Sequence, residues 1–364
     1  MSFLNKKKSK YPKLFIPGPT HVPEEILKAF CKPQIGHRTP EISDLISNIT
    51  LGIQKILNTD NHIYLVSHPA TGLWEMGIRN SVRKKALHCV NGAFSKKWAH
   101  VSDCIGVDYD VLEYEWGKGI RPEDIEKYLK TGKYDAVAVV HNETSTGVMS
   151  DLESIGSVIK KFPDVYFLVD AVSSMAGVKI DVESSNIDFI LASTQKAWGL
   201  PPGFSIAALS DKFISQSKKI KNKGYFLDVA IYEKYYNKSQ TPYTPSIPHL
   251  YGLEKVIEKI FEEGFENRCN RHKSMANYVR TWALRMGQSL YAENGFRSDT
   301  VTSINNDKNW DINKINDKLL AKGFRMDRGY GQLRGDVFRI SHMGNIYEND
   351  LIEYLKTFEG CIDV

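Results

Sequence analysis

The chain has 364 residues, of which 42% are hydrophobic and 25% are charged, as expected for a globular protein large enough for two domains. No run of about 18 apolar residues occurs, and the five cysteines are widely spaced without a CxxC pair, which argues against a membrane span, a disulfide framework and a structural zinc site. The net charge of +5 comes mostly from scattered basic residues, so we expect a cytoplasmic protein that binds neither nucleic acid nor membranes and holds no metal.

A cluster of lysines near the N-terminus predicts a solvated basic tail over residues 1–13. Short apolar runs then alternate with amphipathic ones. The apolar runs are rich in β-branched and aromatic residues, as in strands buried on both faces, and lie at 63–67, 86–90, 134–141, 165–172, 189–193 and 204–210. Helical patterns occupy 122–132 and 151–162. The alternation predicts an α/β fold with a doubly wound, mostly parallel sheet in a large domain over 14–250.

The sequence pattern changes after residue 250. Residues 250–287 read as one long helical region, and a mixed α+β segment follows from 296 to 364. We therefore expect a smaller α+β domain over 251–364, with its boundary near 240–255.

Two charged residues follow two of the apolar runs. Asp170 ends VYFLVD, and Lys196 comes shortly after FILAS. Ligands of open α/β sheets bind outside the carboxyl ends of the strands, and an acid with an amine at that place fits pyridoxal phosphate (PLP). This cofactor needs a lysine for its covalent link and an anion beside its ring nitrogen. Taken singly, Asp170 merely ends a strand and Lys196 is a solvated loop lysine.

The segment SHPATGLWE is a candidate phosphate site. If Thr71 and Gly72 open a helix, the unpaired N–H groups of its first turn attract an anion, and the Thr71 hydroxyl adds a donor. The alternative is a plain helix start in which Glu75 supports the first turn.

Two further segments turn polar just after apolar runs. In NGAFSKKW, Phe94 or Trp98 is able to stack on a planar ring, although most aromatic residues so placed belong to a core. In HNETSTG, Asn142 and Thr144 are able to bond a ring substituent, and an ordinary polar turn is the alternative.

An arginine stands inside the apolar stretch of GDVFRISHMGN. Because burying an unpaired guanidinium is costly, Arg339 needs an anionic partner. Arginine binds carboxylates through two parallel hydrogen bonds, so a substrate carboxylate fits this position. A structural ion pair with an acid of the same domain fits it equally well.

Taken together, these motifs resemble the class V aminotransferases of PLP fold type I, and most of all the alanine–glyoxylate and serine–pyruvate transaminases. The resemblance covers residues from about 14 to 345. It rests on FIPGPTHVP, IGHRTPE, ATGLWE, NGAFSKKW, HNETSTGV, LVDAVSSMAG, STQKAWGLPPG, YTPSIPHLYGL and FRISHMGN. It implies a mostly parallel sheet of the seven-stranded type and a homodimer with composite active sites.

The resemblance also implies a role for each matching residue. Lys196 would hold PLP covalently, and Asp170 would pair with the ring nitrogen. The ring faces would be covered by Phe94 and Val172, and Thr144 would reach the phenolic oxygen. Ala70, Thr71 and Gln195 would bind the phosphate, with Gly72 in the same helix start and Thr244 reaching over from a second subunit. Arg339 would grip the substrate carboxylate, near the loops Pro17–Thr20 and Gly36–Arg38, which include His37.

Three positions depart from the family pattern. The phosphate loop, usually Ser-Gly-Thr or Ser-Gly-His, reads Pro69-Ala70-Thr71, and so loses a hydroxyl and a backbone N–H. The stacking aromatic, often tryptophan, is Phe94. A tyrosine that commonly assists the phosphate from the neighbouring subunit is Thr241, and Tyr243 beside it is a candidate replacement.

The resemblance implies a ping-pong transaminase that moves an amino group from alanine or serine to glyoxylate or pyruvate. A 2-aminoethylphosphonate–pyruvate type of transaminase is the alternative, kept open by His37, Arg38 and Arg328. A cysteine desulfurase would need a thiolate in the loop at 327–338, which contains no cysteine. A non-catalytic relative is opposed by the presence of Lys196, Asp170 and Arg339 together.

Overall fold

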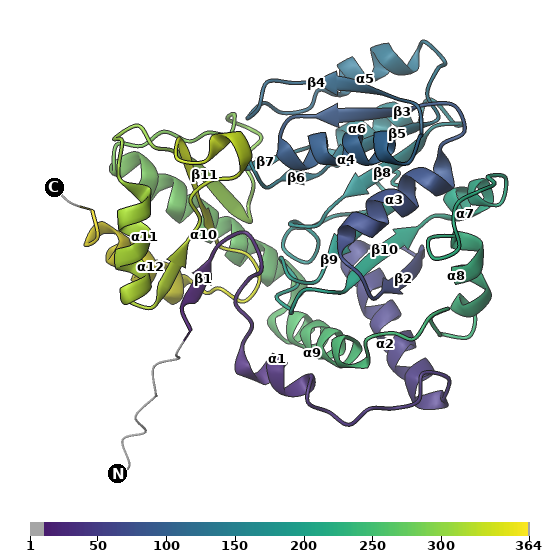
Figure 1. Cartoon of the computed structure of the whole chain (residues 1–364), viewed down its shortest axis with the longest axis horizontal. Coiled ribbons are helices and arrows are strands. Elements are labelled where there is room, and N and C mark those ends of the chain that lie inside the picture. Colours follow the sequence, from purple (N-terminus) through teal and green to yellow (C-terminus); the bar gives the residue numbers. More distant parts are fainter. Residues whose placement is uncertain (1–10, 363–364) are drawn as a thin grey trace.

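The computed structural model describes residues 11–362, and a seven-stranded sheet forms its centre (Figure 1). The strands follow the order β2–β10–β9–β8–β5–β3–β4. Their bounds are β2 His62–Val66, β3 Ala86–Val90, β4 Tyr109–Glu113, β5 Ala136–Val140, β8 Tyr166–Asp170, β9 Phe189–Ser193 and β10 Ser205–Leu209. Strand β10 is antiparallel to both of its neighbours, and every pair from β9 to β4 is parallel. The predicted α/β fold with a mostly parallel sheet is confirmed.

All six predicted strands are present, but β4 was missed. It lies at the edge of the sheet, and only Leu112 of its five residues is buried. Its sequence, YDVLE, therefore carries two acids and lacks the continuous apolar character by which the inner strands were found.

Helices cover both faces of the sheet, as a doubly wound fold requires. Alternate residues of each strand point to opposite faces, so Ile63 and Leu65 join one core while Tyr64 and Val66 join the other. The first core includes residues of α2 Pro40–Leu57, α5 Pro122–Leu129, α6 Leu152–Ile159 and α9 Ile247–Glu263. The second includes residues of α3 Ala70–Ser81, α4 Ala93–Cys104, α7 Asp211–Ser217 and α8 Val229–Tyr236.

A smaller lobe with its own core is built from the C-terminal part of the chain. It contains α10 Phe265–Arg285, β11 Val301–Asn305, α11 Ile312–Ala321, β12 Phe324–Met326, a 3₁₀ turn Gly331–Leu333, β13 Val337–Ser341 and α12 Glu348–Glu359. The N-terminal strand β1 Lys13–Phe15 pairs in parallel with β12, so purple β1 lies beside the yellow elements in Figure 1.

The predicted long helical region at 250–287 is two helices. Gly264 separates α9 from α10 with φ +81°, a backbone conformation that glycine adopts readily. Helix α9 packs against α2 and the short helix α1 Glu24–Ala29. The domain division near residue 250 remains a proposal, and these contacts place α9 on the core of the large sheet.

The predicted basic tail lies outside the described residues except for Tyr11 to Lys13, the last of which begins β1. Among residues 11–362, no helix combines the length and the apolar character needed to cross a bilayer. Beyond the seven-stranded sheet, β6 Asn142–Glu143 and β7 Val148–Met149 form a short hairpin just after β5.

Candidate active site

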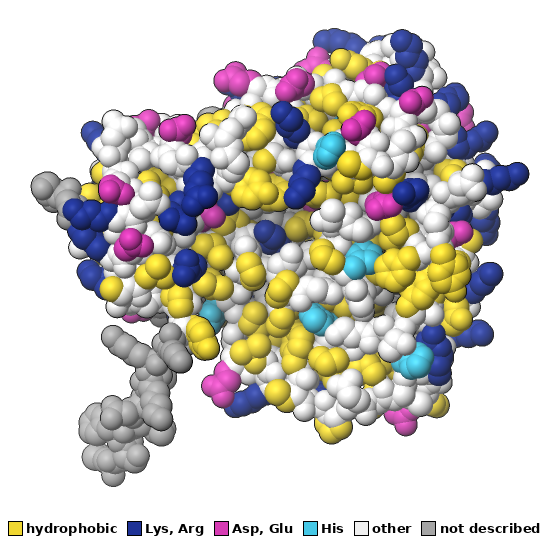
Figure 2. Space-filling model, in the orientation of Figure 1, with side chains coloured by type: hydrophobic (Ala, Val, Ile, Leu, Met, Phe, Trp, Pro, Cys, Tyr) yellow, Lys and Arg dark blue, Asp and Glu magenta, His cyan; other side chains and the backbone are white. Residues whose placement is uncertain are grey.

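Asp170 and Lys196 lie at the same edge of the sheet. Strands β8 and β9 are parallel neighbours, with Asp170 paired with Leu191. Asp170 is the last residue of β8, and Lys196 follows the end of β9 by three residues. Both therefore project into the crevice where the sheet meets the smaller lobe, and Figure 2 shows that the surface is hollowed between the two lobes.

This crevice contains a cavity of about 170 Å³. Most of the residues proposed from the sequence for the cofactor line it, together with several that the sequence did not single out. The lining residues are Pro69, Ala70, Thr71, Trp74, Phe94, Val140, Asn142, Thr144, Asp170, Val172, Ser173, Gln195 and Lys196. Three segments far apart in the chain thus converge on one volume with the segments of Asp170 and Lys196.

Asp170 is a buried carboxylate with one protein donor on each oxygen. The Trp74 indole N–H donates to Oδ2 at 2.7 Å, and the Val172 backbone N–H donates to Oδ1 at 2.7 Å. Burial raises the pKa of Asp170 to about 6, while these two hydrogen bonds act in the opposite direction. The carboxylate is held in one orientation and is largely ionised at neutral pH.

The amino group of Lys196 has a lower pKa than that of an ordinary lysine. Burial and the positive charge of Arg339 lower the pKa of Lys196 to about 8, and the carboxylates of Asp170 and Asp327 partly oppose this shift. Its Nζ donates to the Pro17 carbonyl oxygen. The neighbouring Gly18 has φ +120°, and a Cβ there would lie 2.5 Å from Lys196 Cδ, so the Pro17–Pro19 turn approaches the lysine through glycine.

Helix α3 opens directly at the cavity. Pro69 is its N-cap and has no side-chain cap bond, and Ala70 and Thr71 of the first turn line the cavity. Glu75 does not support this turn, because its carboxylate accepts from Arg79 Nε at 2.6 Å one turn further on. The first-turn N–H groups and the helix dipole suit an anion, in keeping with the phosphate interpretation of this segment.

The backbone of Phe94 is held in place by Glu143, a buried carboxylate that was not predicted from the sequence. Glu143 is fully buried and accepts from the backbone N–H groups of Phe94 at 3.1 Å, Ser95 at 2.9 Å and Ser145 at 3.1 Å, and from the hydroxyls of both serines. It thereby caps the start of α4 and orients Phe94. Trp98, the other aromatic candidate, is buried against Trp74 and does not line the cavity.

Glu143→Gln is expected to destabilise the protein by about 1–3 kcal/mol, because the new NH₂ group faces N–H donors and leaves some of them unsatisfied. The free energy of unfolding from denaturant titration measures this loss. Exposed Glu153, in the first turn of α6, supplies the matched control Glu153→Gln, which should change stability by less than about 0.5 kcal/mol. Equal stabilities of the two variants would refute the capping role.

Asn142 and Thr144 meet at Ser173. Thr144 Oγ1 lies 2.9 Å from Ser173 Oγ, and Asn142 Nδ2 donates to Ser173 Oγ at 2.8 Å and to Thr300 Oγ1 at 2.9 Å. The Asn142 Oδ1 atom is buried and has no hydrogen-bond partner among residues 11–362. The cavity wall therefore presents an unused acceptor and two hydroxyls to a polar ligand.

Arg339 forms the structural ion pair that was one interpretation of its position, and its role toward a substrate carboxylate stays a prediction. Its Nε and Nη2 donate to the two oxygens of Asp327 at 2.7 and 2.9 Å, and its Nη1 donates to the Thr144 carbonyl oxygen at 2.8 Å. A guanidinium has five N–H groups, so these three bonds leave two for a carboxylate. The ion pair anchors Arg339 in the smaller lobe. Arg339 does not itself line the cavity, but its bond to Thr144 ties it to a residue that does.

A family model matches the chain over residues 15–324, and its description is aminotransferase class V. The chain belongs to the class V aminotransferases. This match spans the main sheet, the strand ends that carry Asp170 and Lys196, and the first part of the smaller lobe.

Named relatives extend over nearly the whole chain. The chain is 37% identical to an uncharacterised aminotransferase of Methanocaldococcus jannaschii, covering 95% of this chain and 91% of the relative. It is 32% identical to the L-aspartate–glyoxylate aminotransferase of Paracoccus denitrificans (95% and 90% covered) and to the serine–glyoxylate aminotransferase of Methylorubrum extorquens (93% and 88% covered). The crystal structure of an alanine–glyoxylate aminotransferase from Nostoc sp. superposes with a TM-score of 0.92 at 26% identity, covering 98% of this chain and 97% of that one.

Class V aminotransferases use PLP, and the residues of this cavity fit that group. A buried acid, an amine of lowered pKa and a helix N-terminus surround one volume. The unpartnered Asn142 Oδ1 and the Thr144 hydroxyl add polar groups between them. The acid, the amine and the helix start are thus groups of the kinds that PLP binding requires.

Some predicted site residues do not line the cavity of this aminotransferase. Thr244 is exposed and absent from the lining. Gly36, His37, Gly72 and Arg339 are likewise absent from it. The loop that carries Gly36 and His37 is tied to the segment before Thr244, because Arg38 donates to the carbonyl oxygens of Thr241 at 2.8 Å and Pro242 at 3.0 Å.

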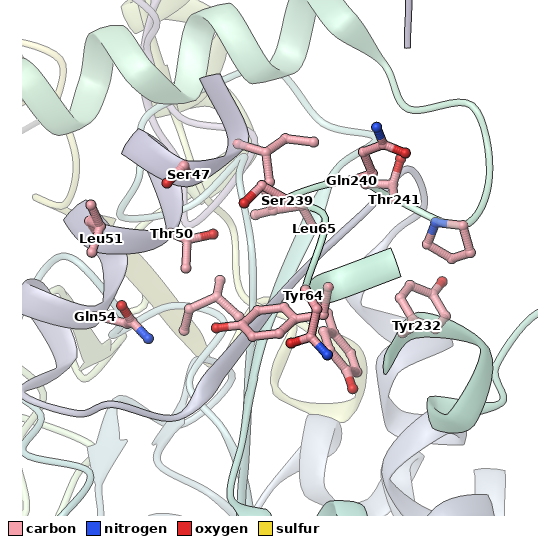
Figure 3. Close-up of a pocket in the computed structure, with 15 residues that line it drawn as sticks. Ser47, Thr50, Leu51, Gln54, Tyr64, Leu65, Tyr232, Ser239, Gln240 and Thr241 are labelled. Carbon is pink, nitrogen blue, oxygen red and sulfur yellow. The ribbon is translucent and has the colours of Figure 1, made fainter. Parts of the chain in front are cut away.

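A second hollow lies under that segment. It measures about 280 Å³ and is lined by residues of α2, β2 and α8 together with Ser239, Gln240 and Thr241 (Figure 3). It is larger than the Lys196 cavity, yet Asp170 and Lys196 do not line it. We therefore choose the candidate site by its buried acid and lysine and not by its size.

Three residues that contact members of the candidate active site were not predicted from the sequence: Trp74, Glu143 and Asp327. Asp327 carried no recognisable signal, because it lies 12 positions before Arg339 in a glycine-rich loop. Glu143 was visible as the acid in HNETSTG. Trp74 was visible only as an aromatic residue on an amphipathic helix, where a core position is the usual explanation.

Proposed function

We propose that this class V aminotransferase uses PLP to move an amino group from a small α-amino acid, alanine or serine, to a 2-oxo acid, glyoxylate or pyruvate. The observation that carries the proposal is the convergence of Lys196 and Asp170 on one cavity. Arg339 is bonded to the carbonyl oxygen of Thr144, a lining residue, and keeps two N–H groups for a further partner. An amino acid offers the two groups this arrangement accepts, an amine and a carboxylate.

PLP, when bound, supplies a carbonyl group that links to amines and a ring that accepts the electron pair released from the substrate Cα. The chain supplies the proton transfers. Lys196 holds its proton weakly, since its pKa is lowered to about 8 by burial and by Arg339, and so serves as the base that removes the Cα proton once it is released from the cofactor. The Asp170 carboxylate holds a proton on the ring nitrogen.

Positioning comes from the residues around this pair. Phe94 and Val172 lie on the cavity wall, where they bound the space for a planar ring. The start of α3 would bind the phosphate, with Thr71 as a side-chain donor and with Gln195, which lines the same cavity, as a further polar partner. Arg339 holds the substrate carboxylate, which fixes the Cα–H bond relative to Lys196.

Alanine, serine and glyoxylate are proposed from the relatives. Two of them, both 32% identical, are named as aspartate–glyoxylate and serine–glyoxylate aminotransferases, and the Nostoc structure is named as an alanine–glyoxylate enzyme. Glyoxylate is common to all three names. The desulfurase alternative is opposed by the positions of the five cysteines, none of which lies in the loop at 327–338.

The proposed enzyme is a homodimer in which Thr244 reaches the phosphate of the partner's cofactor. Support comes from the exposure of Thr244 and from its absence from this chain's own cavity lining, together with the Arg38 bonds that hold the segment in front of it. Thr244 would supply part of the hydrogen bonding that Pro69 cannot offer for lack of an N–H.

Half-reactions test the substrate proposal. The PLP form is mixed with single amino acids, and its visible absorbance is followed as it converts to pyridoxamine phosphate. Alanine or serine is expected to convert it fastest, with aspartate and 2-aminoethylphosphonate as comparisons. Rapid conversion by 2-aminoethylphosphonate without conversion by alanine or serine would favour the alternative transaminase. Rapid conversion by aspartate alone would make aspartate the amino donor and leave the rest of the proposal unchanged.

A further inference from the structure

The indole N–H of Trp74 donates a hydrogen bond to the carboxylate of Asp170. Trp74 lies on the first turns of α3 and is 4% exposed, and its Nε1 donates to Asp170 Oδ2 at 2.7 Å. It also lines the cavity that holds Lys196. Trp74 thus both lines the cavity and donates a hydrogen bond to the carboxylate there, so its role is not limited to packing in the core.

A hydrogen bond to the ionised form of a carboxylic acid favours that form. Asp170 needs this help, because burial raises its pKa to about 6 and so brings protonation close to neutral pH. The Val172 N–H gives the same help to the other oxygen, but it is a backbone group that no substitution short of proline removes. Trp74 is therefore a side chain whose hydrogen bond favours the ionised form of Asp170 and orients its Oδ2 atom.

The ionisable groups around Asp170 do not replace the indole. Glu143, in the hairpin after β5, is negatively charged and favours protonation of Asp170, while Lys196, after β9, favours its ionised form. His141, at the end of β5, bonds Ser174, and burial lowers its pKa to about 4, so it is neutral throughout the relevant range. The indole supports the Asp170 anion through a hydrogen bond that does not depend on the charge of Lys196.

Trp98 offers a matched comparison. Its ring stacks on Trp74 at 6.2 Å with an interplanar angle of 17°, and it is equally buried. Its own N–H, however, donates to the Trp74 backbone carbonyl oxygen at 3.3 Å and does not reach Asp170. Both indoles belong to the same hydrophobic core, but the N–H of Trp74 donates to Asp170 and that of Trp98 does not.

We propose that Trp74 is a positioning residue that fixes the orientation and the ionised state of Asp170, and so sets the affinity for PLP and the pH range over which PLP binds. This inference rests on the proposed function, in which Asp170 pairs with the ring nitrogen. Its physical basis is a charge-assisted hydrogen bond inside a site that excludes water.

The test titrates the apoprotein with PLP and follows the visible absorbance of the lysine-bound cofactor, at pH values below and above the pKa of Asp170. Trp74→Phe is expected to weaken PLP binding roughly tenfold or more, the effect of losing a hydrogen bond to a charged group. The loss should grow as the pH falls, because without the indole Asp170 takes up its proton at higher pH. Trp98→Phe should stay within about threefold of the wild type at every pH.

A double-mutant cycle with Asp170→Asn separates this role from packing. In the Asp170→Asn background there is no anion to support, so adding Trp74→Phe should cause little further loss of affinity. Should Trp74→Phe fail to fold, Trp74→Tyr, which keeps more of the ring volume but has no N–H at that place, takes its part in the same comparison.

Three results would overturn the inference: an unchanged affinity and pH dependence in the Trp74→Phe protein, an equal effect of Trp98→Phe, or full additivity in the cycle. Failure of the wild-type protein to bind PLP at all would instead overturn the proposed function. The two failures are therefore distinguishable.

Discussion

Replacing Lys196 with alanine is expected to abolish the visible absorbance of lysine-bound PLP and to reduce turnover by roughly 10²–10⁴-fold through the lost proton transfer alone. No other lysine lines the cavity, so no other amine among the described residues is placed to take its part. Its removal also leaves the Pro17 carbonyl oxygen without the Nζ donor. Absorbance spectra of the reconstituted protein and the rate of the half-reaction with alanine or serine measure the two effects.

The control is Lys179→Ala. Lys179 is exposed and does not line the Lys196 cavity, so its loss should leave both the spectrum and the rate unchanged. Substantial transamination by the Lys196→Ala protein would remove the assignment of this lysine as base. Loss of activity in both variants would point to a folding defect instead.

Arg339→Met is expected to affect stability and substrate binding together. The side chains of Arg339 and Asp327 are 5% and 16% exposed, and removing one partner of such a buried pair leaves the other charge uncompensated, at a cost of about 3–5 kcal/mol. Loss of the hydrogen bonds from Arg339 to the substrate carboxylate should raise KM for the amino donor roughly tenfold or more. Denaturant titration and steady-state kinetics measure the two effects separately.

A second variant separates the two roles of Arg339. Asp327→Asn combined with Arg339→Met removes both charges, so most of the lost stability should return, because no buried charge is left unpaired. KM should stay high, since the carboxylate has still lost its guanidinium. If KM recovers along with stability, Arg339 is only a structural ion pair, which is the other interpretation of its place in an apolar strand.

The sequence and the structure agree best where the chemistry depends on strand ends. The run that ends at Asp170 and the run that precedes Lys196 are continuous and apolar. The positions of β8 and β9 could therefore be predicted from the apolar character of these two short segments. The edge strand β4 was not found, because half-exposed strands lack that signal. The helical region after residue 250 was recognised, but its division at Gly264 was not, because a single glycine within a helical pattern does not by itself end a helix.

The sequence by itself determined which residue types stand at the ends of the strands, and therefore that an acid, an amine and a helix start would meet at one edge of a parallel sheet. The tertiary structure decided the partners of these groups. Trp74 and Asp170 are 96 positions apart, and Arg339 and the Thr144 carbonyl oxygen are 195 apart. Local pattern follows from backbone periodicity and burial, which are written in neighbouring residues. A hydrogen bond between distant side chains depends on how whole elements pack, and no short stretch of sequence contains that information.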